Sequence, residues 1–167
     1  MLSQHPGSGY DLLKRFEKSM ANVWPATQSQ LYGELNKLAA SGLIEVSDVG
    51  PRGRKEYRVT ESGRAELVRW ISNPQDDPVW RRSDLLRVFL LEEVPLDDAR
   101  AYIATVVEQA ESDLKRYEHL RDSIDWVTDG DFYGRAALEY GIRDATMAAE
   151  WARWLIDAID ERAAKKV

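Results

Sequence analysis

The feature that most constrains the fold is a polar, proline-bearing stretch near the middle of the chain, Asn73-Pro74-Gln75-Asp76-Asp77-Pro78. Proline ends helices and strands, and the residue before it is pushed out of the helical region. We therefore interpret residues 73–82 as a connector between two domains, 1–72 and 83–167. A chain of 167 residues is long enough for two such small domains.

Two helices are predicted at the start of the first domain. Apolar side chains recur at helical spacing over residues 10–16, and Ser8 is placed to cap that helix. Trp24-Pro25 interrupts the pattern, after which Thr27 is expected to cap a second helix that runs to about Ser41. One face of this second helix is apolar and carries Leu31, Leu35, Leu38 and Ala39.

A β-hairpin is predicted next. Residues 43–47 and 56–60 have strand-like composition, and residues 48–55 between them are rich in turn formers and cations. Thr60 is then expected to cap a third helix over residues 61–71. The order helix, helix, hairpin, helix is typical of a winged helix-turn-helix domain. The core face of the third helix is assigned to Leu67, Trp70 and Ile71.

The second domain has a helical pattern throughout. A short helix is predicted over residues 83–91, a long one over 97–124 and a last one over 132–164, with Asp129-Gly130-Asp131 as the break between the long helices. Their apolar stripes are too extensive for one small bundle, so we expect a homodimer in which each long helix packs on the partner's last helix. The predicted fold class is α+β, mostly helical with a small hairpin wing.

Charge is distributed unevenly between the two domains. The net charge is −6, but residues 1–72 carry ten Lys and Arg against eight Asp and Glu, whereas residues 73–167 carry 13 against 21. A mildly basic first half and an acidic second half indicate two separate roles. No apolar run approaches the length of a membrane span, and residues 1–6 lack the pattern of a signal peptide, so a cytoplasmic protein without a membrane partner is expected.

The sequence gives no support for an enzyme. The chain has no cysteine, and its two histidines, His5 and His119, stand in no metal-binding spacing. Neither a phosphate-binding glycine loop nor a nucleophile motif is present in the sequence. We therefore expect no catalytic residue, no metal and no cofactor.

Polar side chains crowd the second helix away from its apolar stripe. Such side chains hydrogen-bond base edges or phosphates, and the positive end of a helix favours phosphate. A solvated helix face would have the same composition, so this pattern alone leaves both interpretations open. The residues are Gln28, Ser29, Gln30, Tyr32, Asn36 and Lys37.

The predicted wing carries more cations than anions. Residues 50–58 include four cations and one anion among two glycines and a proline. Arginine and lysine neutralise phosphates, and glycine lets the backbone approach a duplex. A basic solvated turn remains the alternative.

These segments together closely resemble PadR-type transcriptional regulators. The rest of the chain resembles, more weakly, the helical carboxy-terminal domain of the larger subgroup of that family, at residues 85–91 and 137–155. The stronger part rests on Ser8-Gly9-Tyr10-Asp11-Leu12, on residues 24–35 (WPATQSQLYGEL), on Leu38 and Gly42-Leu43-Ile44, and on residues 53–63 (GRKEYRVTESG).

The resemblance implies a repressor that binds a palindromic operator in double-stranded DNA as a homodimer and is released by a small effector. It implies that the family's helix before the Gly-Tyr motif is either short here or begins upstream of Met1. It places Thr27, Gln28, Ser29, Tyr32 and Lys37 on the recognition helix. Gln30 is a further DNA-binding candidate, because it is one of the polar side chains of the same helix. It places Arg52, Arg54 and Lys55 at the wing tip.

The chain has six tryptophans, which is many for its length. Core packing and dimer contacts account for most of them. The alternative is an aromatic pocket for a flat effector, for which the candidates are Trp126, Trp151 and Trp154.

Two further functions remain open at this point. The protein could be a ligand sensor that has lost DNA binding, or an interaction adaptor that uses the winged helix as a scaffold. The basic wing argues against both.

Overall fold

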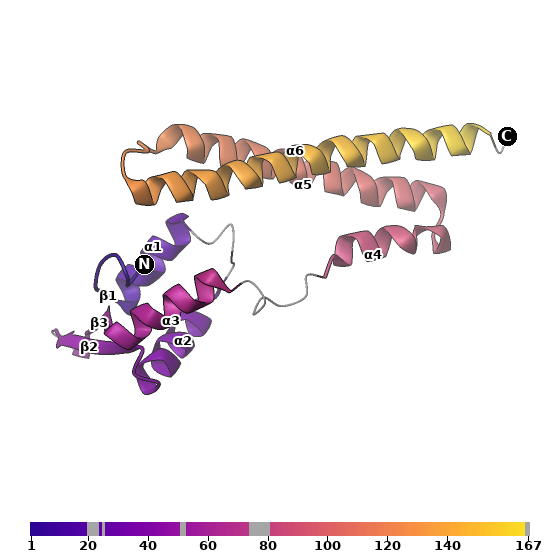
Figure 1. Cartoon of the computed structure of the whole chain (residues 1–167). Coiled ribbons are helices and arrows are strands. Elements are labelled where there is room, and N and C mark those ends of the chain that lie inside the picture. The colour runs from indigo at the N-terminus through magenta and orange to yellow at the C-terminus, as the bar shows by residue number, and fades with distance from the viewer. Residues whose placement is uncertain (20–23, 25, 51–52, 74–80, 166–167) are drawn as a thin grey trace. The chain divides into compact units, whose positions relative to one another are not determined.

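The first of two units of the chain combines short strands with helices (Figure 1). The computed structural model describes residues 1–19, 24, 26–50, 53–73 and 81–165. The chain divides into two compact units, Met1–Val79 and Trp80–Val167. The first unit contains β1 (Gly7–Ser8), α1 (Gly9–Ser19), α2 (Gln28–Ala40), β2 (Ile44–Val49), β3 (Lys55–Val59) and α3 (Glu61–Ser72).

Local capping sets the helix boundaries of this unit. Ser8 and Asp11 cap α1 reciprocally: the Ser8 backbone N–H donates to the Asp11 carboxylate, and the Asp11 N–H donates to Ser8 Oγ. Thr27 caps α2 and Thr60 caps α3, both as predicted. The chain leaves α2 through Gly42, whose φ of 71° is a left-handed conformation that glycine adopts at little cost.

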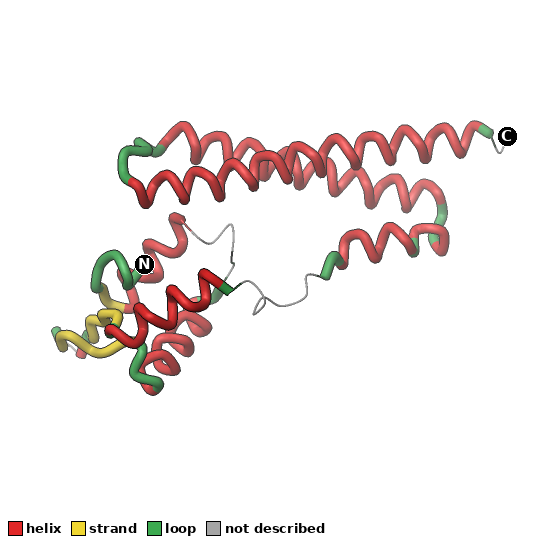
Figure 2. Tube along the Cα trace, in the orientation of Figure 1, coloured by secondary structure: helices red, strands yellow, loops and turns green. Residues whose placement is uncertain are grey.

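The strands form one antiparallel sheet in the order β1-β3-β2. Glu45 of β2 pairs with Arg58 of β3, and the register shifts between Val46 and Asp48, where β2 has a bulge. The third strand, β1, was not predicted from the sequence; its Gly7 pairs with Tyr57 of β3. Figure 2 shows strands only in the first unit of the described chain.

The core of the first unit lies where α1, α2 and the sheet meet. Leu12 of α1, Leu35 of α2, Ile44 of β2 and Tyr57 of β3 are buried together. The predicted apolar face of α2 therefore points inward. The prediction for α3 was partly wrong, because Trp70 and Ile71 are 53% and 65% exposed.

The second unit is an antiparallel pair of long helices preceded by a short one. It contains α4 (Ser83–Phe89), a 3-10 turn (Leu91–Glu93), α5 (Leu96–Ser123) and α6 (Asp129–Ala164). Figure 1 shows α5 and α6 lying side by side. The described elements agree with the predicted fold class, mostly helical with a small hairpin wing.

Small residues allow α5 and α6 to approach closely. Ile103 of α5 and Ala152 of α6 are completely buried, and Ala145 and Ala149 of α6 are nearly so. Exposed ion pairs flank this seam, with Arg100 Nε 2.8 Å from Asp160 Oδ1. One face of each long helix is thus covered within the same chain.

The break between α5 and α6 lies earlier than predicted. Residues 129–131 are the first turn of α6 rather than a break, because Thr128 caps the helix. Asp131 completes a capping box: its carboxylate accepts a 2.8 Å hydrogen bond from the Thr128 backbone N–H. An aspartate three residues after a threonine indicates a helix start, which outweighs the neighbouring glycine.

Candidate nucleic-acid interface

The first turn of α2 presents four exposed polar side chains, those of Thr27, Gln28, Ser29 and Gln30. The turn contains no acidic residue. The unsatisfied backbone N–H groups and the helix dipole therefore leave partial positive charge at this end of α2. Such an end favours an anion such as a phosphate.

Two of these four side chains cap the helix. Gln30 Oε1 accepts hydrogen bonds from the backbone N–H and the hydroxyl of Thr27, at 2.8 and 3.0 Å. The Gln30 N–H in turn donates to Thr27 Oγ1. Gln28 and Ser29 make no side-chain hydrogen bond within the described part of the chain. They are therefore the side chains of this turn that remain available to a ligand.

Tyr32 and Lys37 lie further along α2 and differ in what they contact. The Tyr32 ring packs on Gly9 of α1, where an added Cβ would lie 2.4 Å from the ring. Tyr32 thus joins α2 to α1, while 36% of its surface stays exposed. Lys37 Nζ lies 2.6 Å from Glu34 Oε1 in an exposed pair. Such pairs contribute little to stability, so the ammonium can exchange this partner for another anion.

The wing is the turn between β2 and β3. The Gly50 N–H donates a 2.8 Å hydrogen bond to the Arg54 carbonyl, and Gly53 has a φ of 74° that suits glycine. Arg54 and Lys55 are both exposed. Arg52, which was also predicted for the wing tip, lies outside the described residues.

Arg54 is held by a partner on α1. Its Nη2 lies 2.6 Å from Asp11 Oδ2, and Asp11 also accepts a 2.7 Å hydrogen bond from the Ser8 hydroxyl. The Ser8 hydroxyl and N–H, followed by Arg54, lower the pKa of Asp11 to about 2. Asp11 thus holds Arg54 of the wing in place, and this contact was not predicted from the sequence. The Ser-x-x-Asp spacing indicates that Ser8 and Asp11 cap α1, but it does not indicate the ion pair with Arg54.

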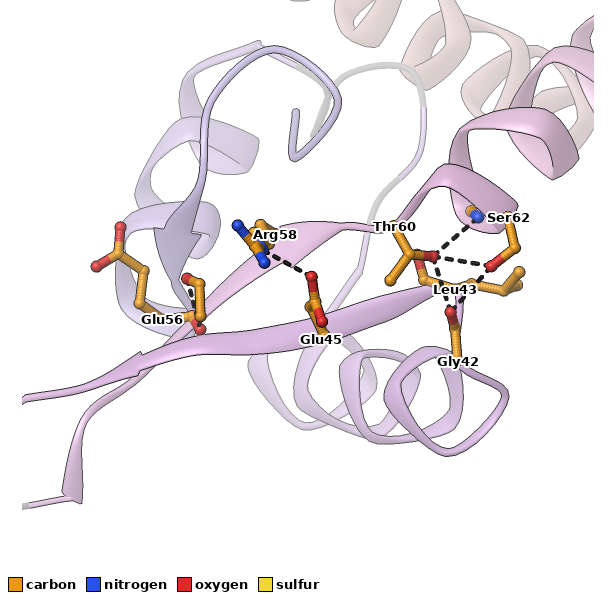
Figure 3. Close-up of polar contacts among 9 residues, drawn as sticks. Gly42, Leu43, Glu45, Glu56, Arg58, Thr60 and Ser62 are labelled. Carbon is orange, nitrogen blue, oxygen red and sulfur yellow. Dashed lines mark hydrogen bonds and ion pairs between the residues drawn. The ribbon is translucent and has the colours of Figure 1, made fainter.

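The base of the hairpin is fixed by a second set of polar contacts (Figure 3). Glu45 and Arg58 face each other across the sheet with 2.7 Å between Oε1 and Nε. Near the start of α3, the hydroxyls of Thr60 and Ser62 both donate to the Gly42 carbonyl, at 2.8 and 3.1 Å. The turn that ends α2 is thus tied to the residues that begin α3.

The three candidate tryptophans do not meet within one chain. Trp126 donates its indole N–H to the Arg121 carbonyl at 2.9 Å and lies near Gly134 of α6. Trp151 packs on the α5–α6 core, and Trp154 is 61% exposed. The 17 residues from Gly134 to Trp151 span about 25 Å along a helix, so no single pocket of this chain contains all three indoles.

The described residues hold no group of three or more His, Cys, Asp and Glu side chains that could bind a metal ion. None of the described helices combines the length and the apolar character needed to span a bilayer.

Two protein families match consecutive parts of the chain. Residues 1–69 match the transcriptional regulator PadR-like family, and residues 80–160 match the virulence activator alpha C-terminal family. The probable transcriptional regulator Rv1176c of Mycobacterium tuberculosis is 38% identical over 76 residues, 44% of this chain and 40% of that protein. The negative transcriptional regulator PadR of Bacillus subtilis is 36% identical over 74 residues, 42% of this chain and 41% of that protein. The alignments thus span about two fifths of each relative.

Solved structures share the fold over nearly the whole length. The crystal structure of B. subtilis PadR in complex with operator DNA has a TM-score of 0.80 at 22% identity and covers 95% of this chain and 94% of that one. The complex of the same protein with p-coumaric acid has a TM-score of 0.77 at 24% identity, with 95% and 94% covered. These relatives are regulators rather than enzymes. Residues 1–69 thus belong to the PadR-like family of transcriptional regulators.

Proposed function

We propose that the protein is a transcriptional repressor that binds a palindromic operator as a homodimer and releases it when a small aromatic effector binds. The observation that carries this proposal is the pairing of exposed Gln28 and Ser29 at the positive end of α2 with exposed cations on the wing of the same unit. This is the arrangement that a winged helix uses on DNA.

The candidate residues make two kinds of contact with DNA, one with base edges and one with phosphates. Gln28 and Ser29, which lack partners within the described chain, read base edges in the major groove. Lys37, Arg54 and Lys55 contact phosphates. We assign the same role to Arg52, which lies outside the described residues. Thr27, Gln30 and Tyr32 support the first kind of contact by capping and seating α2. The operator complex of B. subtilis PadR supports DNA binding as the function of this unit.

An exposed apolar stripe on α6 supports the homodimer. Its members follow one another at intervals of seven residues and are 50–74% exposed. A seven-residue repeat keeps side chains on nearly the same face of a helix, which is how helices of two chains pair. This heptad stripe consists of Tyr133, Tyr140, Met147 and Trp154.

The p-coumaric acid complex of B. subtilis PadR supports an effector of the aromatic class. If Trp126, Trp151 and Trp154 contact one such molecule together, a second copy of the chain must bring them within reach, because one chain holds them apart.

A DNA-binding assay tests the function. The full chain is titrated into a fluorescent duplex from the region upstream of its own gene and into a scrambled duplex of the same length, at fixed salt. We expect binding to the upstream duplex to be tighter by a factor of roughly 10³ or more. Equal affinity for the two duplexes would contradict operator binding. No binding to either would leave a ligand sensor or an adaptor as the function.

A further inference from the structure

Arg54 of the wing uses only one of its nitrogens in its ion pair with Asp11. Its Nη2 lies 2.6 Å from Asp11 Oδ2, and its side chain makes no other hydrogen bond to the described residues. A guanidinium has five N–H donors in one rigid plane. The pair therefore leaves most of these donors free, and 59% of the Arg54 side chain stays exposed. Arg54 can keep its partner and bind a phosphate at the same time.

The Asp11 carboxylate is fixed more firmly than the guanidinium. Its Oδ2 accepts hydrogen bonds from the backbone N–H and the hydroxyl of Ser8, at 3.1 and 2.7 Å. Ser8 is 2% exposed and lies in β1, where it pairs with Glu56 of β3. Asp11 is thus a rigid support on which the long and flexible side chain of Arg54 is ordered.

The turn of α1 that carries Asp11 also contacts α2. Gly9 lies against the Tyr32 ring, where an added Cβ would be 2.4 Å from the nearest ring atom. Gly9 and Asp11 are two residues apart, so one helical turn contacts both α2 and the wing. The ion pair therefore orders Arg54 relative to the helix that carries the proposed base contacts.

Asp11 affects DNA binding in two opposite ways. Its negative charge reduces the attraction between this unit and a duplex, although salt at physiological concentration screens the effect over about 8 Å. Its hydrogen bond orders Arg54 before DNA arrives, and ordering an arginine is among the largest entropy costs that a side chain incurs. Because salt screens the first effect and not the second, we expect the second to be larger.

We propose that Asp11 is a positioning residue for DNA binding, which orders Arg54 so that the free N–H groups of the guanidinium meet a phosphate. The proposal deepens the proposed function and rests on it for the DNA contact of Arg54. Phosphates recur along every duplex, so the effect applies to the operator and to other DNA alike. A carboxylate thereby strengthens binding to a polyanion.

The test measures the affinity of the full chain for the upstream duplex and for the scrambled duplex at neutral pH and fixed salt. Asp11→Asn keeps the size of the side chain and removes its charge. It is expected to weaken binding to both duplexes by about threefold, because Arg54 must then be ordered on binding. Simple electrostatics predicts the opposite sign, since the variant is less negative than wild type.

Glu45→Gln is the matched control. Glu45 is also paired with an arginine of the hairpin, with 2.7 Å between its Oε1 and Arg58 Nε (Figure 3). Arg58 is 58% exposed, like Arg54, but has no proposed DNA contact. Glu45→Gln therefore removes the same charge without releasing a phosphate-binding side chain, and it should tighten binding to both duplexes by about twofold.

A second background separates positioning from folding. Arg54→Ala removes the side chain that Asp11 orders, so only the charge effect of Asp11 remains. In this background Asp11→Asn should tighten binding by about twofold, as Glu45→Gln does in wild type. The effect of the same substitution thus changes sign with the presence of Arg54.

Unchanged or tighter binding of Asp11→Asn in the presence of Arg54 would overturn the proposal. Weaker binding that persists in the Arg54→Ala background would also overturn it, because Asp11 would then act through the folding of α1. If wild type bound neither duplex, the proposed function would fail together with this inference. Equal wild-type affinity for the two duplexes would contradict operator binding alone, and the change of sign on the scrambled duplex would still decide the role of Asp11.

Discussion

Arg54 on the wing and Asp11 on α1 form an ion pair that joins residues 43 positions apart, with 2.6 Å between Nη2 and Oδ2. Ser8 donates hydrogen bonds to the same Oδ2 atom through its hydroxyl and its backbone N–H. The wing is therefore anchored to the helix that packs against α2. Arg54 positions the hairpin while its charge stays close to the surface.

The first prediction concerns acid stability. The pKa of Asp11 falls from 3.8 to about 2 on folding, so the ionised carboxylate stabilises the folded state at pH values above about 4. The free-energy difference between wild type and Asp11→Asn should be constant above pH 5 and shrink as the pH falls from about 4 to 2. Urea unfolding at a series of pH values measures it. A difference that does not change over this range would contradict the ionised pair.

The second prediction separates the wing from the recognition helix. Replacing Arg52, Arg54 and Lys55 by alanine should weaken binding to operator and scrambled DNA equally. For every phosphate that these cations no longer neutralise, the salt dependence of log K should decrease by about one unit. Salt titrations on both duplexes measure the slope. If the triple variant kept the affinity and the salt slope of the wild type, the wing would not contact DNA.

The third prediction uses the same two duplexes. Gln28→Ala or Ser29→Ala should cost about 1–3 kcal/mol on the operator and almost nothing on scrambled DNA. The reason is that neither side chain has another partner in the described chain. Wild-type behaviour of both variants on both duplexes would show that this turn of α2 does not read bases.

The fourth prediction compares two glycines. An added Cβ on Gly63 of α3 would lie 1.9 Å from the Leu43 carbonyl oxygen, so Gly63→Ala must displace α3 and should destabilise the first unit by about 1–3 kcal/mol. Gly33 of α2 has nothing within 4 Å of the same position, so Gly33→Ala should stabilise by about 1 kcal/mol. Thermal unfolding followed by circular dichroism distinguishes them. Equal effects would mean that α3 does not pack this closely.

The fifth prediction concerns the heptad stripe of α6. Met147→Glu or Tyr140→Glu places a charge in the proposed dimer seam, and sedimentation equilibrium should then give the monomer mass of 19.1 kDa. Arg135→Glu, an exposed charge change on the same helix outside the stripe, should leave the dimer intact. A dimer that survives both stripe variants would place the interface elsewhere.

Features with a local cause could be predicted from the sequence. Thr27 and Thr60 cap their helices because a hydroxyl meets N–H groups only three residues ahead. The same local logic, applied to Thr128 and Asp131, would have found the start of α6. The glycine between two aspartates predicts a break there, but the capping box makes the same residues the first turn of α6.

Features that depend on distant partners could not be predicted. Strand β1 has two residues, and only its pairing with Tyr57 and Glu56 makes it a strand. The charge of Arg54 indicated an anionic partner, but no sequence pattern indicates that Asp11 is one. Periodicity placed Trp70 on an apolar face of α3 without showing what covers that face, and within the described chain Trp70 stays half exposed.

The short strand β1 also decides what the sheet exposes to other protein molecules. Unpaired strand edges act as templates on which further chains add strands, and this is a common route to aggregation. β1 occupies the edge of β3 at Tyr57 and Glu56, while the outer edge of β2 is interrupted by a bulge and carries Glu45 and Asp48. Detaching residues 7–8 would leave Tyr57 at an open edge, and the hairpin would then recruit other copies of the chain into intermolecular sheets.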